Sequence, residues 1–190
     1  MKRRALITGS KGFIGGHLKS KLHKLGWEVF SWDLIDSKDV REVAGFDMKV
    51  DCVFHLAGIS GQNYFKNNLI EGYDINLTGT LAVLNYSQKM NARCIFASTS
   101  GVYQSNDEKV DESSTLDPQT PYAISKLLGE NLCYQFSKDW DTSITVLRIF
   151  NVYGREQVET FLIPYIVKKF INGETLEIRM PEAARDFIHV

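Results

Sequence analysis

The sequence has few cysteines, almost no net charge and no long apolar run, and each of these argues against a class of protein. Its three cysteines, Cys52, Cys94 and Cys133, are odd in number and far apart, which predicts buried free thiols in a reducing compartment. The 22 basic and 23 acidic residues leave a net charge of -1, which gives no electrostatic basis for binding nucleic acid or an anionic membrane. No apolar run approaches the roughly 20 residues that cross a bilayer. The basic N-terminus leads into an apolar strand, unlike a signal peptide. We expect a soluble, cytoplasmic protein.

A glycine turn joins the first predicted strand, residues 3–8, to the first predicted helix, residues 12–25. This arrangement directs backbone N–H groups and the positive end of a helix at a pyrophosphate. Gly9 would allow the tight turn, Gly12 the approach of the phosphates, and Gly15 the close packing of the helix on the strand. The spacing, G-x-x-G-x-x-G, is a variant of the dinucleotide-binding fingerprint. The alternative is a glycine-rich turn without a ligand.

Asp33 closes the second predicted strand, Glu28–Trp32, and lies 18 residues after Gly15. An acidic residue about 20 residues beyond the glycine turn accepts hydrogen bonds from the adenosine ribose hydroxyls. The same carboxylate would repel a 2′-phosphate, which favours NAD over NADP. The alternative is a surface aspartate at the end of a strand.

The rest of the chain alternates strands and helices. Strands are predicted at 50–58, 93–97, 143–150 and 175–178, and helices at 38–45, 69–90, 120–137 and 158–172. Residues 59–68 read as a loop. The alternation predicts an α/β fold, a Rossmann-like doubly wound parallel sheet with helices on both faces and ligands at the carboxyl ends of its strands.

Three residues in these elements receive structural roles. Ser37 is the predicted N-cap of the 38–45 helix. Thr120, followed by Pro121, is the predicted N-cap of the 120–137 helix. His55 lies within a nearly continuous apolar run, which favours a hydrogen-bonded core histidine over a catalyst.

Tyr122 and Lys126 are four residues apart at the beginning of a helix, so they share one face of it. The ordinary pKa of tyrosine, about 10, is too high for a base near neutral pH. A lysine ammonium and a nicotinamide cation would stabilise the phenolate and lower that pKa. Thr99, at the end of the preceding strand, would hold the reacting oxygen beside Tyr122. The alternative is a surface Tyr/Lys pair, which is common at this spacing.

Together these features resemble the extended short-chain dehydrogenase/reductases and, among them, the NAD-dependent nucleotide-sugar epimerases. The resemblance covers nearly the whole chain and rests on Thr8–Gly15, Asp33, His55–Gly58, Asn76 with Gly79 and Thr80, Ser98–Tyr103, Tyr122–Lys126, Arg148–Gly154 and Arg185–Val190. It implies an NAD-binding domain over 1–154, followed by the beginning of an incomplete, smaller substrate-binding region over 155–190.

The resemblance also implies roles for individual residues. The catalytic residues would be Thr99, Tyr122 and Lys126. The cofactor-binding residues would be Gly9, Lys11, Gly12, Phe13, Ile14, Gly15, Asp33, Leu56, Ala57, Gly58, Asn76, Tyr122 and Lys126. The substrate-binding residues would be Thr99, Ser100, Asn151 and Arg185, with Asn151 at the diphosphate. No metal site is expected.

The implied function is epimerisation of a nucleotide sugar by transient oxidation at C4, with NAD as cofactor and Tyr122 as acid/base. One alternative is an NAD(P)-dependent reductase of a nucleotide-linked keto sugar or another small carbonyl. Another is a non-catalytic NAD-binding module. Ser100 and Gly101 stand where family dehydratases and decarboxylases carry an acidic residue, which argues against elimination of water. A homodimer through the 69–90 and 120–137 helices is implied too, although core packing explains their apolar faces equally well.

Two departures from the family pattern concern segments that are short or absent. The family places a third strand, with an aspartate for adenine, before the strand at 50–58. Here the segment leaves almost no room for it, and residues 33–36 would fill both positions. The family also continues well beyond the position of Val190, so the chain is either a fragment or a shortened form.

Overall fold

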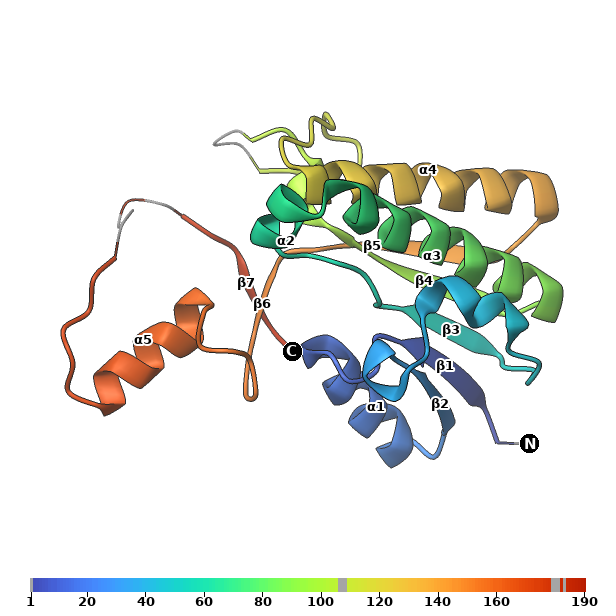
Figure 1. Ribbon diagram of the computed structural model, residues 1–190, viewed down its shortest axis with the longest axis horizontal. Helices are drawn as coiled ribbons and strands as arrows, with labels where there is room; N and C mark the ends of the chain where they lie inside the picture. Colours follow the sequence, from blue (N-terminus) through green and yellow to red (C-terminus); the bar gives the residue numbers. More distant parts are fainter. Residues whose placement is uncertain (1, 106–108, 179–181, 183) are drawn as a thin grey trace. The chain divides into compact units, whose positions relative to one another are not determined.

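The computed structural model describes residues 2–105, 109–178, 182 and 184–190. They form two compact units, Met1–Ile149 and Phe150–Val190. The first unit is a five-stranded parallel sheet with helices on both faces (Figure 1). The predicted Rossmann-like α/β fold is therefore confirmed.

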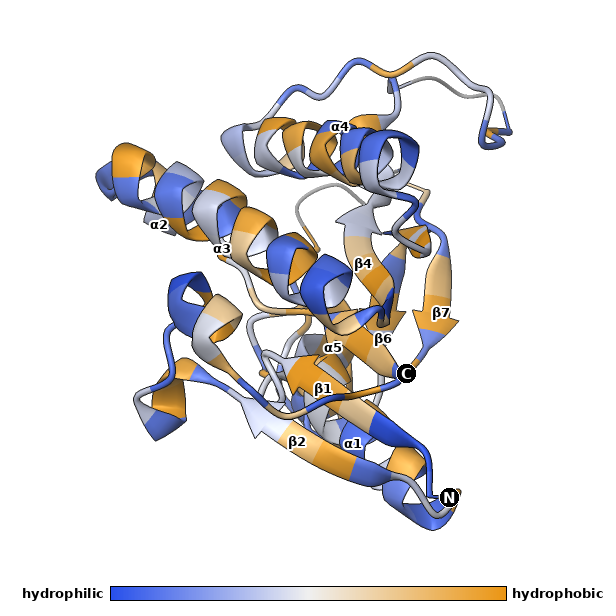
Figure 2. Ribbon diagram, turned by 90° about the vertical axis from the view of Figure 1, so that its right-hand side faces the viewer, coloured by the Kyte–Doolittle hydropathy of each residue, from blue (hydrophilic) through white to orange (hydrophobic). Residues whose placement is uncertain are grey.

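The sheet contains β1 (Arg4–Thr8), β2 (Glu28–Trp32), β3 (Cys52–His55), β4 (Arg93–Thr99) and β5 (Ile144–Ile149), in the order β2-β1-β3-β4-β5. Ala5, Leu6 and Ile7 of β1 have no exposed surface, and this strand is largely orange in Figure 2. All pairings are parallel. The carboxyl ends of the strands therefore share one edge, where ligands bind in such sheets.

Helices cover both faces of the sheet (Figure 1). The helix α1 (Phe13–Lys24) lies on one face, and α3 (Leu69–Met90) and α4 (Pro121–Trp140) lie side by side on the other. The larger hydrophobic cluster joins Cys94 and Phe96 of β4 to side chains of α3 and α4. The strand β4 alternates buried and half-buried residues, as a strand covered on both faces does.

The segment between β2 and β3 differs from its prediction. The expected helix at 38–45 is replaced by two short 3₁₀ helices, η1 (Leu34–Asp36) and η2 (Val40–Gly45). Ser37 adopts a left-handed backbone, φ 57°, and ends η1, so its prediction as an N-cap was wrong. The cap of η2 is Asp39, whose carboxylate accepts the N–H of Arg41 at 2.9 Å.

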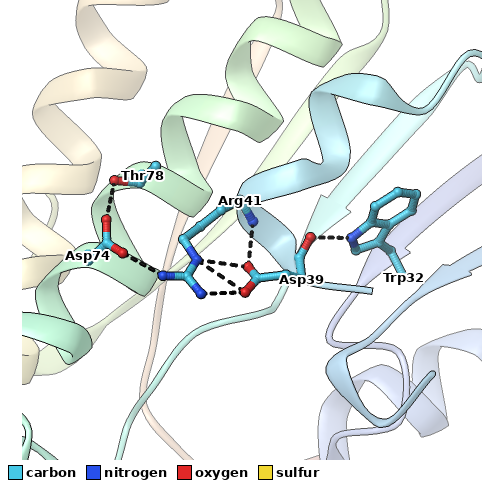
Figure 3. A network of polar contacts seen from close by, with 5 residues as sticks. All are labelled: Trp32, Asp39, Arg41, Asp74 and Thr78. Atoms are coloured by element: carbon cyan, nitrogen blue, oxygen red, sulfur yellow. Dashed lines mark hydrogen bonds and ion pairs between the residues drawn. The ribbon is translucent and has the colours of Figure 1, made fainter. Parts of the chain in front are cut away.

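A polar network holds this short segment (Figure 3). The guanidinium of Arg41 binds Asp39 on one side and Asp74 of α3 on the other. Trp32 Nε1 donates to the carbonyl of Asp39 at 2.7 Å, and Thr78 Oγ1 donates to Asp74 at 2.7 Å. Among the described residues no strand stands between β2 and β3, so the sheet ends at β2. The ion pair between Arg41 and Asp74 connects the segment to α3 instead.

The remaining differences concern short elements. The expected loop at 59–68 contains α2 (Gln62–Asn67), whose Phe65 is buried against the ring of Tyr73. Tertiary burial of that one ring stabilises a helix that the local sequence does not indicate.

The second unit contains α5 (Leu162–Ile171) and a two-stranded parallel sheet of β6 (Asn151–Tyr153) and β7 (Phe187–His189). The prediction missed both strands, which are three residues long and pair across more than 30 residues of chain. The strand predicted at 175–178 was wrong, because these residues have no ladder partner.

All three cysteines are buried and free, as predicted. Within the described ranges, no helix has both the length and the apolar character to cross a membrane. The same ranges hold no cluster of His, Cys, Asp and Glu side chains suited to a metal ion.

Candidate functional site

The glycine turn after β1 has a shape that only glycine permits. Gly9 has a φ of 70°, and a Cβ there would lie 2.7 Å from the backbone nitrogen of Ala57. A Cβ on Gly15 would lie 2.1 Å from the carbonyl oxygen of Gly9. The first turn of α1 therefore packs directly on the turn.

This turn suits an anion such as a pyrophosphate. Gly12 is the N-cap of α1 and supplies no side-chain cap, and the first turn of α1 contains no acidic residue. Helix N-termini with free N–H groups favour negative charge. Ser10 Oγ is buried in the same turn, without a hydrogen-bond partner among the residues described. Phe13 and Ile14 are half-buried in the first helical turn.

Asp33 lies where the sequence predicts, at the tip of β2 beside the glycine turn. Its two carboxylate oxygens accept the N–H groups of Lys11 at 2.8 Å and Ile35 at 3.0 Å. A carboxylate has about four acceptor positions, so two remain for ribose hydroxyls. The geometry fits the adenosine end of a dinucleotide.

The chain that leaves β3, Leu56–Gly58, runs past Asn76 of α3. Asn76 accepts the N–H of Ile59 at 2.7 Å and donates to the Ile59 carbonyl at 3.0 Å. A Cβ on Gly58 would lie 3.0 Å from Asn76 Oδ1 and 3.5 Å from Lys126 Nζ. The fold thus brings Gly58, Asn76 and Lys126 together, as expected for one cofactor site.

The helix α4 begins as predicted, with Pro121 in its first turn and Thr120 Oγ1 accepting the N–H of Ala123 at 3.2 Å. This cap places Tyr122 against the end of β4, where it hydrogen-bonds to Thr99. Burial raises the pKa of Tyr122, and the hydrogen bond with Thr99 acts in the opposite direction. The phenol is therefore protonated at neutral pH.

Lys126 is 6% exposed and lies one helical turn beyond Tyr122. Burial lowers its pKa to about 8. Its ammonium lies 4.9 Å from the centre of the Phe96 ring, within the range of a cation–π interaction. Lys126 is thus a buried cation beside the candidate acid/base.

His55 is a core histidine, as the sequence predicts. Thr80 Oγ1 donates to the Asn76 carbonyl at 2.6 Å, so it accepts from His55 Nε2 at 3.1 Å. Thr8 Oγ1 accepts the N–H of Ala57 and donates to His55 Nδ1 at 2.8 Å. The ring is therefore neutral, with its proton on Nε2. Burial, assisted by the nearby charge of Lys126, lowers its pKa to about 3.

The sequence prediction missed a buried polar cluster behind the site. Ser98 Oγ donates to Glu130, and Arg148 binds both oxygens of the same carboxylate, the shortest contact being 2.8 Å. The guanidinium carbon of Arg148 also lies 4.9 Å from the centre of the Tyr103 ring. The available signal was the spacing: Glu130 follows Lys126 by four residues and continues the face that begins at Tyr122.

The candidate substrate residues are divided between the two units. Thr99 and Ser100 lie in the first unit, at the end of β4 and the beginning of η3 (Ser100–Val102). Asn151 and Arg185 lie in the second, where Asn151 Nδ2 donates to the carbonyl of Asp186 at 3.0 Å and Arg185 is exposed.

A parallel sheet with a glycine turn after β1, an acidic residue at the tip of β2 and a Tyr/Lys pair on α4 define a dinucleotide-dependent protein of the short-chain dehydrogenase/reductase type. Residues 5–190 match the NAD dependent epimerase/dehydratase family, and the chain belongs to that family. The predicted resemblance and the NAD cofactor are therefore confirmed.

Individual relatives are similar at about 30% identity or somewhat less. The chain is 30% identical to an uncharacterized UDP-glucose epimerase, YtcB, of Bacillus subtilis, over 97% of this chain and 68% of that protein. Other relatives of similar identity are UDP-sugar decarboxylases.

Solved structures of nucleotide-sugar epimerases have the same fold as this chain. A UDP-N-acetylglucosamine 4-epimerase from Methanobrevibacter ruminantium superposes with a TM-score of 0.92 at 27% identity, over 100% of this chain and 70% of that one. A UDP-glucuronic acid 4-epimerase from Bacillus cereus, in complex with UDP-glucuronic acid and NAD, superposes with a TM-score of 0.86 at 26% identity, over 98% and 69%. The chain thus spans about two thirds of the length of these proteins.

Proposed function

We propose that the protein is an NAD-dependent 4-epimerase of a nucleotide sugar, acting on UDP-linked hexoses. The observation that carries the proposal is the joint placement of Tyr122, Thr99 and Lys126. A half-buried phenol is hydrogen-bonded to a strand-end hydroxyl, and a buried ammonium lies one turn further along the helix. The UDP-sugar epimerases among the relatives support the choice of substrate class.

Each of the three side chains has a distinct task in this proposal. Tyr122, as the phenolate, takes the proton of the sugar hydroxyl and later returns it. Thr99 donates a hydrogen bond that holds the reacting oxygen beside Tyr122. Lys126 stabilises the phenolate through its positive charge and reaches the nicotinamide ribose. NAD, held by the glycine turn and Asp33, would supply the hydride acceptor and donor for the transient oxidation of the sugar carbon.

The remaining assignments follow the same proposal. Asp33 holds the adenosine ribose, and the glycine turn holds the pyrophosphate. Ser100, Asn151 and Arg185 are candidate contacts to the substrate. Since Ser100 and Gly101 follow Thr99 with no carboxylate, the site has no acid there for elimination of water.

The test uses the purified protein with NAD and a panel of UDP-glucose, UDP-N-acetylglucosamine and UDP-glucuronic acid. We expect interconversion of C4 epimers, read by NMR, without net accumulation of NADH. Tyr122→Phe should lower the rate by about 10²–10⁴, the usual contribution of one acid/base group, while NAD binding is retained. Tyr134→Phe, on an exposed side chain of the same helix, is the matched control.

The alternatives give different results. A reductase would consume NADH in proportion to a keto substrate. A non-catalytic module would bind NAD and turn over no sugar of the panel, and Tyr122→Phe would then change nothing.

We also propose a cytoplasmic homodimer formed through the outer faces of α3 and α4. Leu81 on α3 is 41% exposed, and Ile124 and Leu128 on α4 are 37% and 41% exposed. Large apolar side chains exposed on adjacent helices are typical of an interface. Light scattering should give about twice the 21.6 kDa chain mass, and Leu128→Glu should reduce it to the mass of the monomer. Light scattering that gives the monomer mass for the wild type would refute the dimer.

A further inference from the structure

Beside Asp33, the tip of β2 carries two charged side chains, Lys11 and Asp36, to which the proposed function gives no role. Asp33 Oδ2 accepts the backbone N–H of Lys11 at 2.8 Å, so the side chain of Lys11 starts directly beside the Asp33 carboxylate. Lys11 lies in the glycine turn, on the side of the turn that faces β2. The basic side chain of Lys11 therefore begins next to Asp33, the carboxylate that would hold the adenosine ribose.

That cation is paired to a second acid. Lys11 Nζ forms an ion pair with Asp36, at the end of η1, three residues after Asp33. The two side chains are 40% and 36% exposed, so the pair lies at the surface, open to a ligand. The hydrogen bond with Lys11 lowers the pKa of Asp36, and the charges of Lys38 and Lys19 act in the same direction. The Asp36 carboxylate is therefore paired with Lys11, and the charges of two further lysines also favour its ionised form.

The chemistry of the two dinucleotides differs at this point alone. NAD offers a ribose 2′-hydroxyl, which a carboxylate binds, whereas NADP carries a 2′-phosphate, which a nearby basic side chain binds. Lys11 would serve as that basic side chain if it were free, since an ammonium binds phosphate as a point charge.

We propose that Asp36 is a second determinant of cofactor choice, acting beside Asp33: it occupies Lys11 and keeps the tip of β2 from recruiting a 2′-phosphate. Lys11 would bind the 2′-phosphate of NADP, but its ion pair with Asp36 prevents this. This inference rests on the proposed dinucleotide-binding function.

The experiment compares the dissociation constants of NAD and NADP by calorimetry for the wild type and for Asp36→Asn, an isosteric change at an exposed position. We expect the wild type to bind NAD more tightly than NADP. Asp36→Asn should bind NADP at least tenfold more tightly than the wild type does, with NAD affinity within about twofold, because the substitution removes a negative charge and frees Lys11. The gain should shrink as salt increases.

Two further variants show whether the gain acts through Lys11. Lys11→Met combined with Asp36→Asn should lose the gain. Glu42→Gln, which removes an exposed charge of the neighbouring η2 away from this pair, should leave both affinities unchanged.

Two results would overturn this inference but leave the proposed function intact. In the first, the wild type binds NAD and Asp36→Asn leaves the NADP affinity unchanged. In the second, the higher NADP affinity persists in the double variant. A wild type that binds neither dinucleotide would overturn the proposed function and this inference with it.

Discussion

Asn76 Nδ2 donates a hydrogen bond of 2.9 Å to Ser125 Oγ and so joins α3 to α4 one residue before Lys126. The same amide group holds both backbone polar groups of Ile59. One buried side chain therefore positions the chain that leaves β3 and the helix that carries the candidate acid/base.

Asn76→Ala should destabilise the protein and weaken NAD binding. The substitution leaves the N–H and C=O of Ile59 without their side-chain partner, and each buried polar group left unpaired costs about 1–3 kcal/mol. Urea unfolding measures the loss. Asn67→Ala is the control, because this residue of α2 is exposed and its side chain donates one hydrogen bond, to the Asn63 carbonyl, among the residues that the structure describes. We expect a change below about 0.5 kcal/mol. Equal losses in the two variants would contradict the assignment.

Local signals explain what the sequence predicted well. Thr120 and Pro121 are adjacent and sufficient to begin α4, and the glycine turn needs only its own spacing. Tyr122 and Lys126 share a face because of helical periodicity, so their proximity could be read from the chain.

Distant partners explain what the sequence did not predict. Asp39 rather than Ser37 caps the segment after β2, because Arg41 and Asp74 hold it there. The strands β6 and β7 exist only as a pair, and neither carries a long apolar pattern. The partners of Glu130 are Ser98 of β4, 32 residues away, and Arg148 of β5, 18 residues away. None of these contacts leaves a periodic signal.

Removing the charge of Glu130 should lower the free energy of unfolding substantially. Glu130 and Arg148 have side chains 8% and 19% exposed, and removing one partner of a buried pair costs about 3–5 kcal/mol because the other charge is left unpaired. Glu130→Gln should lower the free energy of unfolding by about 3 kcal/mol, measured by urea. Arg148→Met in the same chain should restore part of it.

The control for Glu130 is the exposed ion pair of Arg4 and Glu28, whose side chains are both 42% exposed. Glu28→Gln should cost less than about 1 kcal/mol. A comparable loss from both substitutions would show that burial of the Glu130 pair contributes nothing.

NAD should change the titration of Tyr122. In the cofactor-free protein burial raises its pKa, so the phenolate forms only above the ordinary value of about 10. The nicotinamide cation should lower that pKa by about one unit or more. Tyrosinate absorbance of the wild type minus that of Tyr122→Phe isolates this one group, and the difference should titrate at lower pH with NAD than without it. Identical curves with and without NAD would contradict the proposed acid/base role.

His55 should make the protein's stability fall in acid. Its pKa is about 3 in the folded protein and about 6.5 when unfolded. Between these values the unfolded chain binds a proton that the folded chain does not. The contribution of His55 is therefore complete above about pH 6.5 and is lost, at about 1.4 kcal/mol per pH unit, as the pH falls toward 3.

The measurement is urea unfolding of the wild type and His55→Gln at several pH values in this range. The variant should be less stable than the wild type at neutral pH, because the glutamine cannot reproduce both bonds to Thr8 and Thr80. Its stability should fall less steeply in acid, so that the two curves converge. His23→Gln, at an exposed position of α1, should run parallel to the wild type throughout. If the stability of His55→Gln also ran parallel to that of the wild type, the fold would not hold His55 neutral. The hydrogen bonds from Ala57 to Asn76 would then run through a protonated ring.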